Sequence, residues 1–418
     1  MPPEGNFRRE NYQEMAAFGF TEEQEMYREV IRRFAKKELA PGAAARGRGG
    51  ADPALLVDVI DKIKKQGWTA INYPEKYGGL HLDWVNVGIL AEELGKVDLT
   101  AGTIPLFCVM NAVQIPYMTE EVQDELVPQL IDLLALIARG HTEAESGCEF
   151  PTIKTKAVRH GHYYVVNGEK QPASMALFAS HLIFSCKTDT ECPGHEGMSM
   201  LLVPCGTPGM TMSPLPFMAG PLDIPKDDPT YGGGNAIVSF DDCKVPVKYL
   251  LGKEGDGYRL QEEVYNFSRV YGCTLMPLAW AEGTLQYTID YAKERKRFHH
   301  PIIRYQGVSF KIAEHYVNLE AARLLAYQAM HLIDQGLPFT KEASMAKLFG
   351  TQAAERAIHD CLLICGYTAY SMEHWIQDRM RGALAMEIAD GAEQVQKLII
   401  LRELIGKEAL PPGMSDKF

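Results

Sequence analysis

The sequence predicts an α+β protein made of a helical domain, a small β domain and a second helical domain, in that order. Three observations predict it. Apolar residues recur at helical spacing over the first third of the chain, β-branched and aromatic runs broken by Gly and Pro fill the middle, and long helical patterns return after the turn-rich stretch GKEGDGY. The predicted domains are residues 1–136, 137–253 and 254–418.

In the first domain, the segment TEEQEMYREVIRRFAKKELAP predicts a helix that opens with a capping box and ends before Pro41. Thr21 and Gln24 have the spacing at which each side chain accepts a hydrogen bond from the other's backbone N–H. The segment DPALLVDVIDKIKKQGW then carries apolar residues at helical spacing and predicts a second helix. A turn rich in Pro and Gly, YPEKYGGL, follows it.

The β domain is predicted from the runs HYYVVNGEK, HLIFSCK, MSMLLVPC and NAIVSFDDCKVP. Asn167 and Gly168, inside the first run, predict a hairpin turn because Asn-Gly readily adopts the backbone conformation of a tight β-turn. The last domain is predicted to be helical from residue 258 to about 335 and from 340 to 406.

Composition and charge limit the functions that are open to the chain. Its 418 residues, 46% of them hydrophobic, predict a large globular protein, and a formal net charge of -12 argues against a nucleic-acid partner, which would need basic stripes. No apolar run approaches the roughly 18 residues of a membrane span, and the amino terminus lacks a charged-then-apolar leader. The nine cysteines follow no framework pattern, which predicts reduced thiols in the cytoplasm.

The segment AKERKRFHHP carries a dense basic cluster, formed by Lys293, Arg295, Lys296 and Arg297. Two interpretations stay open. The cluster is either a solvated helix end, where cations interact favourably with the helix dipole, or a diphosphate site, where arginine offers a fork of donors matched to phosphate oxygens. His299 and His300 have no third partner at metal-ligand spacing, so no metal site is predicted.

Five separated segments, taken together in their order and spacing, resemble the flavin-dependent acyl-CoA dehydrogenase family. The segments are HTEAESGCE (141–149), YVVNGEKQPAS (164–174), VSFDDCKVPVKYLLGKEGDGY (238–258), RKRFHHPIIRYQGVSFKIAE (295–314) and IADGAEQVQKLIILRELIG (388–406). The third is close to the family pattern almost residue for residue. The resemblance implies an N-terminal helical domain, a small middle β domain and a C-terminal four-helix-bundle domain.

The resemblance also implies an FAD-dependent homotetramer, with a homodimer as the alternative, that acts on an acyl-CoA substrate, passes electrons to an electron-transfer flavoprotein and binds each FAD across a subunit interface. The residues matched to the family's cofactor-binding positions are His141, Thr142, Gly147, Cys148, Ser174, Arg295, Phe298, Gln306, Gly366 and Gln394. Those matched to its substrate-binding positions are Asn266, Arg269 and Gly391.

The Ala-Asp-Gly turn before the last predicted helix holds one short carboxylate, Asp390. At this turn the family carries its catalytic base, usually Glu, and Arg381 matches a family arginine at the expected spacing. The resemblance implies that Asp390 abstracts the α-proton of the thioester while flavin N5 takes the β-hydride, and that the Asp390 N–H helps to polarise the thioester carbonyl. The alternative is that Asp390 only caps the last helix.

Departures from the family pattern predict a pocket widened for a cyclic or otherwise bulky acyl group. Asp is one methylene shorter than Glu, and the family members associated with Asp here act on alicyclic acyl-CoA thioesters or, in a cousin, on nitroalkanes. The residues expected to leave this room are Pro172, Ala173, Ala176, Ala389 and Ala392, while Ser174 offers a hydroxyl near flavin N5. The stretch TIPLFCVMNAV, expected to face the substrate, has no Arg to hold a second carboxylate.

Three alternatives to this function remain. They are a dehydrogenase of a linear or branched acyl-CoA, a flavin oxidase that resembles nitroalkane oxidase, and a non-catalytic flavin-binding member of the family. An oxidase would consume oxygen and make peroxide, whereas a dehydrogenase would need an electron carrier. The match of Asp390 and Arg381 in one register argues against the non-catalytic alternative.

Overall fold

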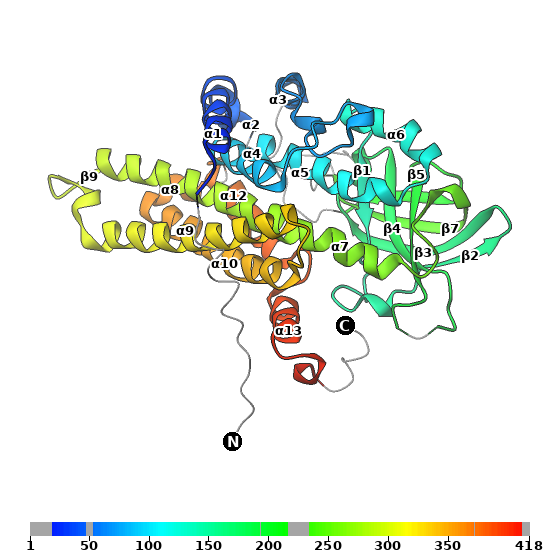
Figure 1. The fold of residues 1–418 in the computed structure, drawn as a ribbon. Helices are drawn as coiled ribbons and strands as arrows, with labels where there is room; N and C mark the ends of the chain where they lie inside the picture. Colours follow the sequence, from blue (N-terminus) through cyan, green and yellow to red (C-terminus); the bar gives the residue numbers. More distant parts are fainter. Residues whose placement is uncertain (1–18, 47–52, 193, 216–233, 372, 412–418) are drawn as a thin grey trace.

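The computed structural model describes residues 19–46, 53–192, 194–215, 234–371 and 373–411. Figure 1 shows a sheet at one end of the molecule, with long helices from the last part of the chain extending away from it. The helices of the first third of the chain lie along one side of both. This arrangement confirms the predicted order of helices, sheet and helices.

The helices before the sheet are α1 (Glu22–Phe34), α2 (Ala40–Arg46), α3 (Pro53–Lys65), α4 (Trp84–Val97), α5 (Leu99–Gln114) and α6 (Glu120–Ile131). The predicted capping box at the start of α1 is confirmed, because Thr21 and Gln24 each accept a hydrogen bond from the other's backbone. The prediction that this helix ends before Pro41 is wrong. A π-helical turn, Ala35–Leu39, leads directly into α2, and Pro41 lies in the first turn of α2.

The segment Leu99–Tyr117, which contains α5, is long and apolar enough to cross a membrane, with a mean hydropathy of 1.3. The expectation that no segment comes near this length was therefore wrong. However, 56% of the segment is buried inside the protein, and Leu106 and Val109 of α5 share one apolar core with Tyr271. Such burial is typical of a core helix.

One mixed sheet is built from the strands β1 (Ile137–Gly140), β2 (Lys156–His160), β3 (Tyr163–Ala173), β4 (His181–Lys187), β5 (Met198–Pro204), β6 (Met210–Pro214), β7 (Ala236–Pro246) and β8 (Leu250–Leu251). Their order is β6-β7-β3-β2-β4-β5-β8, and β1 pairs in parallel with β4. Alternate residues of β4 face two cores: Leu182 and Phe184 pack with the other strands, whereas Ile183 shares a core with Leu126 and Leu130 of α6. The sheet is thereby attached to the N-terminal helices.

The hairpin turn predicted at Asn167 and Gly168 is wrong. Both residues lie inside β3, and the chain turns before them, between β2 and β3. A bulge shifts the pairing with β7 at this point, and the Asn167 side chain bonds both the backbone N–H and the carboxylate of Asp242. A Cβ at Gly168 would lie 2.5 Å from Thr155 Oγ1, so close packing, not a turn, requires this glycine.

The helices after the sheet are α7 (Gly257–Val270), α8 (Met276–Glu294), α9 (Gln306–Asp334), α10 (Thr340–Cys365), α11 (Tyr367–Tyr370), α12 (Ile376–Ile388) and α13 (Glu393–Leu404). A small hairpin, β9 (Lys296–Arg297) and β10 (His300–Pro301), interrupts the segment that was predicted to be continuously helical. One apolar core joins residues of α4 and α5 to residues of α8, α9 and α10. Helices from both ends of the chain are therefore packed together, and they place the turn between α12 and α13 next to α7.

Candidate active site

The Ala-Asp-Gly turn lies between α12 and α13 and bends the chain sharply. Asp390 has a φ of 52° and Gly391 a φ of 93°, both in the left-handed region. Asp is among the residues that tolerate this conformation, whereas a Cβ at Gly391 would lie 2.9 Å from Gln396 Nε2. The backbone of the turn therefore favours the two residue types that the sequence places there.

The carboxylate of Asp390 does not cap helix α13. That helix begins at Glu393, and its N-cap residue, Ala392, makes no side-chain capping hydrogen bond. Instead, the Cys273 thiol donates to Oδ2 of Asp390 at a sulfur–oxygen distance of 3.3 Å. The alternative that Asp390 is only a helix cap is therefore wrong, and its carboxylate is directed toward the junction of α7 and α8.

Cys273 lies in a π-helical turn, Tyr271–Leu275, between α7 and α8. Burial, together with the Asp390 carboxylate, raises the pKa of this thiol well above its ordinary value. The thiol therefore stays protonated at neutral pH and remains a weak hydrogen-bond donor. Among the residues that the structure describes, no cation lies within ion-pairing distance of Asp390, so its carboxylate is not neutralised by a direct partner.

Three buried side chains hold the carbonyl groups of the turn. Arg269 Nε donates to the Asp390 carbonyl at 3.1 Å, and Gln396 Nε2 donates to the carbonyls of Asp390 at 3.1 Å and Gly391 at 2.7 Å. Lys347 Nζ donates to the carbonyls on either side of Asp390, and burial lowers the pKa of this lysine. The Asp390 N–H, in contrast, has no acceptor within the described part of the chain. The carbonyls of the turn are fixed, and one N–H is left for a ligand.

One group of predicted flavin-binding residues lies beside the sheet. A bridge between the main chains of Arg139 and Ser174 places the end of β1 beside the end of β3. Thr142 is half-buried and Ser174 is exposed, and neither hydroxyl has a hydrogen-bond partner among the described residues. Gly147 and Cys148 follow in the same exposed loop. Two open hydroxyls on adjoining strand ends fit the polar edge of a flavin ring, which offers both donors and acceptors.

His141 begins this loop, but its ring is directed into the sheet. The side chain is 5% exposed, and its Nδ1 lies 2.9 Å from Ser185 Oγ. Burial, with the nearby cations Lys170 and Arg139, lowers the pKa of His141 to about 3. The ring is therefore neutral at physiological pH and supports the loop from beneath, so any contact of His141 with a cofactor would come from its backbone.

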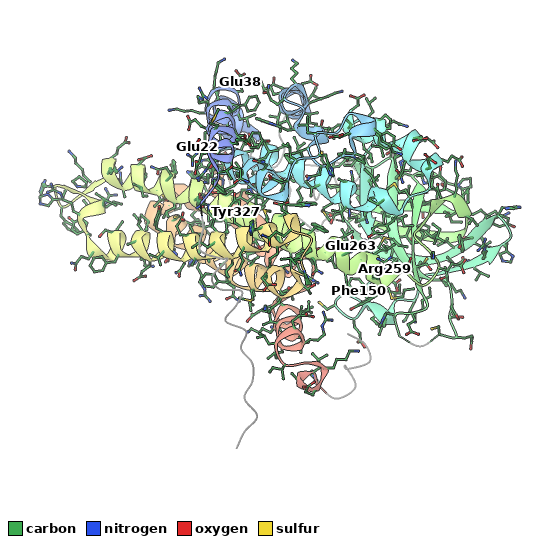
Figure 2. The ribbon with its side chains drawn as sticks, viewed as in Figure 1. Glu22, Glu38, Phe150, Arg259, Glu263 and Tyr327 are labelled. Atoms are coloured by element: carbon green, nitrogen blue, oxygen red, sulfur yellow. The ribbon has the colours of Figure 1, made fainter. Side chains whose placement is uncertain are left out.

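Tyr265 of α7 links this loop to the Asp390 turn. Its ring lies edge-on to His141, with centroids 6.0 Å apart, and the Arg269 guanidinium lies 5.9 Å from the Tyr265 centroid. Phe150, which Figure 2 labels near α7, contacts the same ring with centroids 5.8 Å apart. The open hydroxyls beside the sheet and the Asp390 carboxylate therefore belong to one region of the protein.

The other predicted cofactor residues are divided between two places. Arg295 lies where α8 meets the small hairpin, Phe298 lies in the turn of that hairpin, and Gln306 begins α9. Figure 1 shows this hairpin at the end of the helices that is far from the sheet. Gly366 follows α10, and Gln394 lies in the first turn of α13. A single chain therefore does not bring the hairpin residues against the loop beside the sheet.

The basic cluster at the hairpin is exposed. Lys293 Nζ lies 3.6 Å from Asp290, and Arg297 donates to the carbonyl of Lys296. Both a solvated helix end and a diphosphate site fit an exposed position. Among the residues that are described, no group of three or more His, Cys, Asp or Glu side chains has the arrangement of a metal site.

Asn266 and Arg269, predicted to bind the substrate, are bonded to each other at 2.7 Å between Asn266 Oδ1 and Arg269 Nη1. Asn266 Nδ2 also donates to Thr340 Oγ1 at 3.2 Å. Their contact with a substrate stays a prediction. The structure adds a role that the sequence did not reveal, because Arg269 supports the backbone of Asp390.

Sequence reasoning missed Arg139, Cys273, Lys347 and Gln396. Two of them carried a signal: Arg139 is a lone cation in the short apolar run LIARG, and Lys347 stands among small and apolar residues in ASMAKLFG. A cation on an apolar face needs a specific partner, so each of these two positions indicates a specific contact in the fold. For Cys273 and Gln396 the sequence offers no comparable signal.

Comparison with known proteins agrees with this geometry. The models of the N-terminal, middle and C-terminal acyl-CoA dehydrogenase domains match residues 21–133, 138–224 and 255–405. A probable acyl-CoA dehydrogenase of Bacillus subtilis, YngJ, is 33% identical over 391 residues, which cover 93% of this chain and 99% of the relative.

Two solved structures superpose over nearly the whole chain. Butyryl-CoA dehydrogenase from Megasphaera elsdenii has a TM-score of 0.81 and 27% identity, with 93% of this chain and 100% of the other covered. A structure from a study of the electron-transferring flavoprotein of Acidaminococcus fermentans has a TM-score of 0.81 and 30% identity, with coverage of 93% and 99%. This chain belongs to the acyl-CoA dehydrogenase family of FAD-dependent oxidoreductases.

Proposed function

We propose that Asp390 is the base that removes the α-proton in the FAD-dependent dehydrogenation of an acyl-CoA thioester. The observation that carries this proposal is the turn itself. Its carbonyls are held by Arg269, Gln396 and Lys347, while the Asp390 carboxylate is left with a single thiol donor. A base needs a fixed position and a lone pair that no cation occupies, and this arrangement supplies both.

The reaction divides the work between the protein and its cofactor. The α-C–H of a thioester is weakly acidic, so a carboxylate that is positioned and partly shielded from water can take the proton. Bound FAD would accept the β-hydride at flavin N5. The hydroxyls of Thr142 and Ser174 are the open polar groups beside the sheet that would hold the flavin edge.

The free N–H of Asp390 supports a second role for the same turn. When the α-proton leaves, negative charge develops on the thioester oxygen, and a fixed N–H directed at that oxygen stabilises the charge. The turn is suited to this because its carbonyls are already bonded, so the N–H need not reorganise. Asp390 would thus contribute both its carboxylate and its backbone donor.

We still propose a cyclic or otherwise bulky acyl group as the substrate, but fewer residues support it than the sequence predicted. Ala173 and Ala176 are fully buried in the core of the sheet, so the expectation that they widen the pocket is wrong. Ala389 and Ala392 are half-buried on either side of Asp390 and Gly391. The proposal now rests on these two alanines and on Asp390, whose reach is shorter than that of Glu by about 1.5 Å.

We propose a homotetramer, and the separation of the cofactor residues supports a contact between its subunits. Helix α9 alone, with 29 residues, is about 43 Å long, so the hairpin at its start lies far from the sheet. We propose that Arg295, Phe298 and Gln306 reach the diphosphate half of an FAD held by a neighbouring subunit. Large apolar side chains are exposed along this part of the surface, including Phe298, Phe310, Tyr316 and Val317. Such a patch is typical of a subunit contact.

An electron-transfer flavoprotein is the proposed electron acceptor, because a dehydrogenase of this kind needs a carrier and a solved structure from a study of such a flavoprotein superposes on 93% of the chain. The cytoplasm is the proposed compartment. No disulfide joins the nine cysteines, all of which lie in the described part of the chain, and this is the state expected of thiols there.

Exchange of the substrate α-hydrogen tests the assignment of the base. In deuterium oxide, wild-type protein should label the α-carbon of a bound acyl-CoA, and mass spectrometry would record the label. Asp390→Asn should bind the same thioester but exchange it at least about 100-fold more slowly, since the amide cannot accept the proton. Undiminished exchange in this variant would refute the proposal.

The acyl group is tested by anaerobic bleaching of the flavin with linear, branched, aromatic and alicyclic acyl-CoA thioesters. We expect the fastest bleaching with an alicyclic or branched thioester. Asp390→Glu should slow those substrates and spare a slim linear one, because the longer acid crowds the pocket. A wild-type preference for slim linear thioesters would contradict the bulky substrate but leave the base intact.

A further inference from the structure

Arg139 brings a positive charge to a place where the sequence analysis expected none. Its backbone is part of β1, in parallel register with Ile183 of β4. Its Nη2 donates to Asn111 Oδ1 and to Gln114 Oε1, each at 2.9 Å. Asn111 belongs to the stretch of α5 that was expected to face the substrate, and it is followed closely by Gln114. The absence of Arg from α5 is therefore compensated by an arginine that reaches α5 from the sheet.

The guanidinium of Arg139 has donors to spare. Nη1 makes one bond, to the carbonyl of Ile137 at 3.3 Å, and Nε is buried without any partner among the described residues. An unsatisfied buried donor is costly, so it indicates a ligand or water at that position. Arginine presents its donors as a rigid fork that matches the two oxygens of a carboxylate.

The charge of Arg139 is also incompletely balanced. Within the described part of the chain, no carboxylate lies within ion-pairing distance of it, and its direct partners are neutral amides and a carbonyl. Burial lowers its pKa to about 10, and Tyr73 and Asp390 only partly oppose that effect. The group remains a cation at physiological pH. A half-buried cation that faces neutral amide oxygens can gain more from an anion than from the amides.

The position of Arg139 places this charge within the reacting region. Its main chain is bridged to that of Ser174, whose open hydroxyl is proposed to face the flavin. Asp390 is close enough to influence its charge, although the two do not form an ion pair. Asn111 is 4% exposed and Gln114 is 1% exposed, so the amides that orient the guanidinium are themselves fixed. Arg139 therefore bonds the helix that is expected to line the acyl group and lies near the proposed base.

We propose that Arg139 binds a carboxylate carried by the acyl group, so that the preferred substrate is the CoA monothioester of a dicarboxylic acid. This inference rests on the proposed dehydrogenation of an acyl-CoA and specifies its substrate class. The Nε–H supplies one donor, and Nη2, which lies on the same side of the guanidinium as that N–H, supplies the second when one of its two amide acceptors, Asn111 or Gln114, gives way to the anion. Arg139 is a specificity-determining residue in this scheme, because the proton and the hydride leave from carbons that it does not touch.

Matched substrates test the proposal in the unmodified holoenzyme. Each linear or alicyclic dicarboxylic monothioester would be compared with its methyl ester, which has the same carbon skeleton but no second charge. Anaerobic stopped-flow reduction of the flavin gives the rate and the apparent Kd for each. We expect the free acid to be favoured by about 10- to 100-fold in the ratio of rate to Kd, as for a hydrogen bond to a charged group. Equal values, or a preference for the ester, would overturn the proposal.

Variants identify the residue responsible. Arg139→Gln should lower the acid-to-ester ratio of rate to Kd to about 1, whatever its effect on the rate with the ester, and Arg139→Lys should retain part of the preference. Arg159→Gln is the control, because Arg159 is an exposed arginine on β2, another strand of the same sheet. An equal loss with acid and ester in Arg139→Gln would overturn the proposal, since it would mean that Arg139 serves the flavin or the fold.

The failure of this inference is distinguishable from failure of the proposed function. If neutral acyl-CoA thioesters bleach the flavin and dicarboxylic monothioesters do not, Arg139 has no carboxylate-binding role and the dehydrogenase assignment stands. If no thioester of either kind bleaches the flavin, both proposals are refuted together.

Discussion

Asp390 combines a constrained backbone with an unconstrained carboxylate. Its positive φ would be unfavourable for an isolated residue, and it persists because three buried side chains hold the carbonyls of the turn. The carboxylate itself is bonded only to the Cys273 thiol. The backbone of the proposed base is therefore fixed, while its oxygens remain able to approach a substrate proton.

Gly391→Ala tests how strongly the rate depends on this fixed backbone. The added Cβ would lie 2.9 Å from Gln396 Nε2 and 3.0 Å from Val395 Cγ1, on a residue with a φ of 93°. We expect flavin reduction to slow by about 10- to 100-fold, because a small displacement of the base is costly, while acyl-CoA binding changes little.

Stopped-flow reduction and equilibrium titration would separate the two effects. Gly161→Ala is the control, because Gly161 also has a positive φ, of 61°, and a Cβ there meets nothing within 4 Å. Equal reduction rates in Gly391→Ala and Gly161→Ala would show that the turn is not a positioning device.

At the level of elements, a network of charges joins helices from both ends of the chain. Glu92 of α4 is bonded to Lys96 at 2.7 Å and to Tyr327 of α9 at 2.6 Å, and Arg323 of α9 lies 3.0 Å from it. Lys96 also pairs with Glu282 of α8 at 2.7 Å. Burial raises the pKa of Glu92, but Lys96 and Arg323 outweigh it and lower the value to about 2. Glu92 is thus the acid of the network whose charge is fully compensated by its partners.

Glu282 is the poorly satisfied acid of the same network. Burial, and then repulsion from Glu92, raise its pKa from 4.5 to about 7. The folded protein therefore binds this proton more tightly than the unfolded chain does, so the free energy of unfolding falls as pH rises between these two values. Glu282→Gln removes the charge and keeps a polar side chain, so it should raise the melting temperature by a few degrees at about pH 8.

The difference should disappear below the unfolded pKa of 4.5, where Glu282 is protonated in both states. Differential scanning calorimetry across this range would record it. Glu294→Gln, at the exposed end of the same helix, is the control. A stabilisation that is independent of pH would contradict the assignment of the raised pKa.

Elements defined by local patterns were predictable from the sequence, and those decided by distant contacts were not. The capping box of Thr21 and Gln24 depends on residues one turn apart, and it forms as predicted. Asn167-Gly168 has the local signature of a hairpin, yet pairing with β7 and the close approach of Thr155 place it inside a strand. Local preference is a weak guide where tertiary packing opposes it.

The same division applies to the candidate site. Asp390 could be located from the sequence because its turn lies within a recognisable segment. The contacts that define its environment could not, because Cys273, Arg269 and Lys347 are between 43 and 121 positions away from it along the chain. Arg139 could not be predicted from the stretch expected to face the substrate, because that stretch lies on α5 and the arginine that reaches it belongs to a strand.

At the scale of the whole molecule, the predicted domain boundaries at residues 136 and 253 remain a proposal. Apolar cores join elements on both sides of these positions: α4 and α5 share a core with α8, α9 and α10, and α6 shares another with β4 and β5. The three predicted domains therefore do not pack as independent units. The proposed cofactor site also joins distant parts of the fold, but it does so between subunits. Its flavin-binding residues lie beside the sheet, whereas its proposed diphosphate-binding residues lie at the far hairpin.

Arg295→Ala tests the proposed site between subunits and the two interpretations of the basic cluster. If Arg295 contacts a diphosphate, the variant should lose FAD several-fold faster on gel filtration, as shown by the ratio of flavin to protein absorbance, with the helices intact by circular dichroism. Lys293→Ala, in the same cluster but beside Asp290, is the control. Equal retention of FAD in wild type and Arg295→Ala would favour a solvated helix end.

Pre-steady-state reduction of the flavin in Asp390→Asn tests the central claim most directly. Asn has nearly the size of Asp and tolerates the same left-handed backbone, so the turn should survive, but its amide cannot accept a proton. The wild-type protein should be reduced rapidly by a good acyl-CoA substrate. Asp390→Asn should bind that substrate with a similar Kd and be reduced about 10²- to 10⁴-fold more slowly. Reduction of Asp390→Asn at a rate close to that of wild type would show that another group is the base.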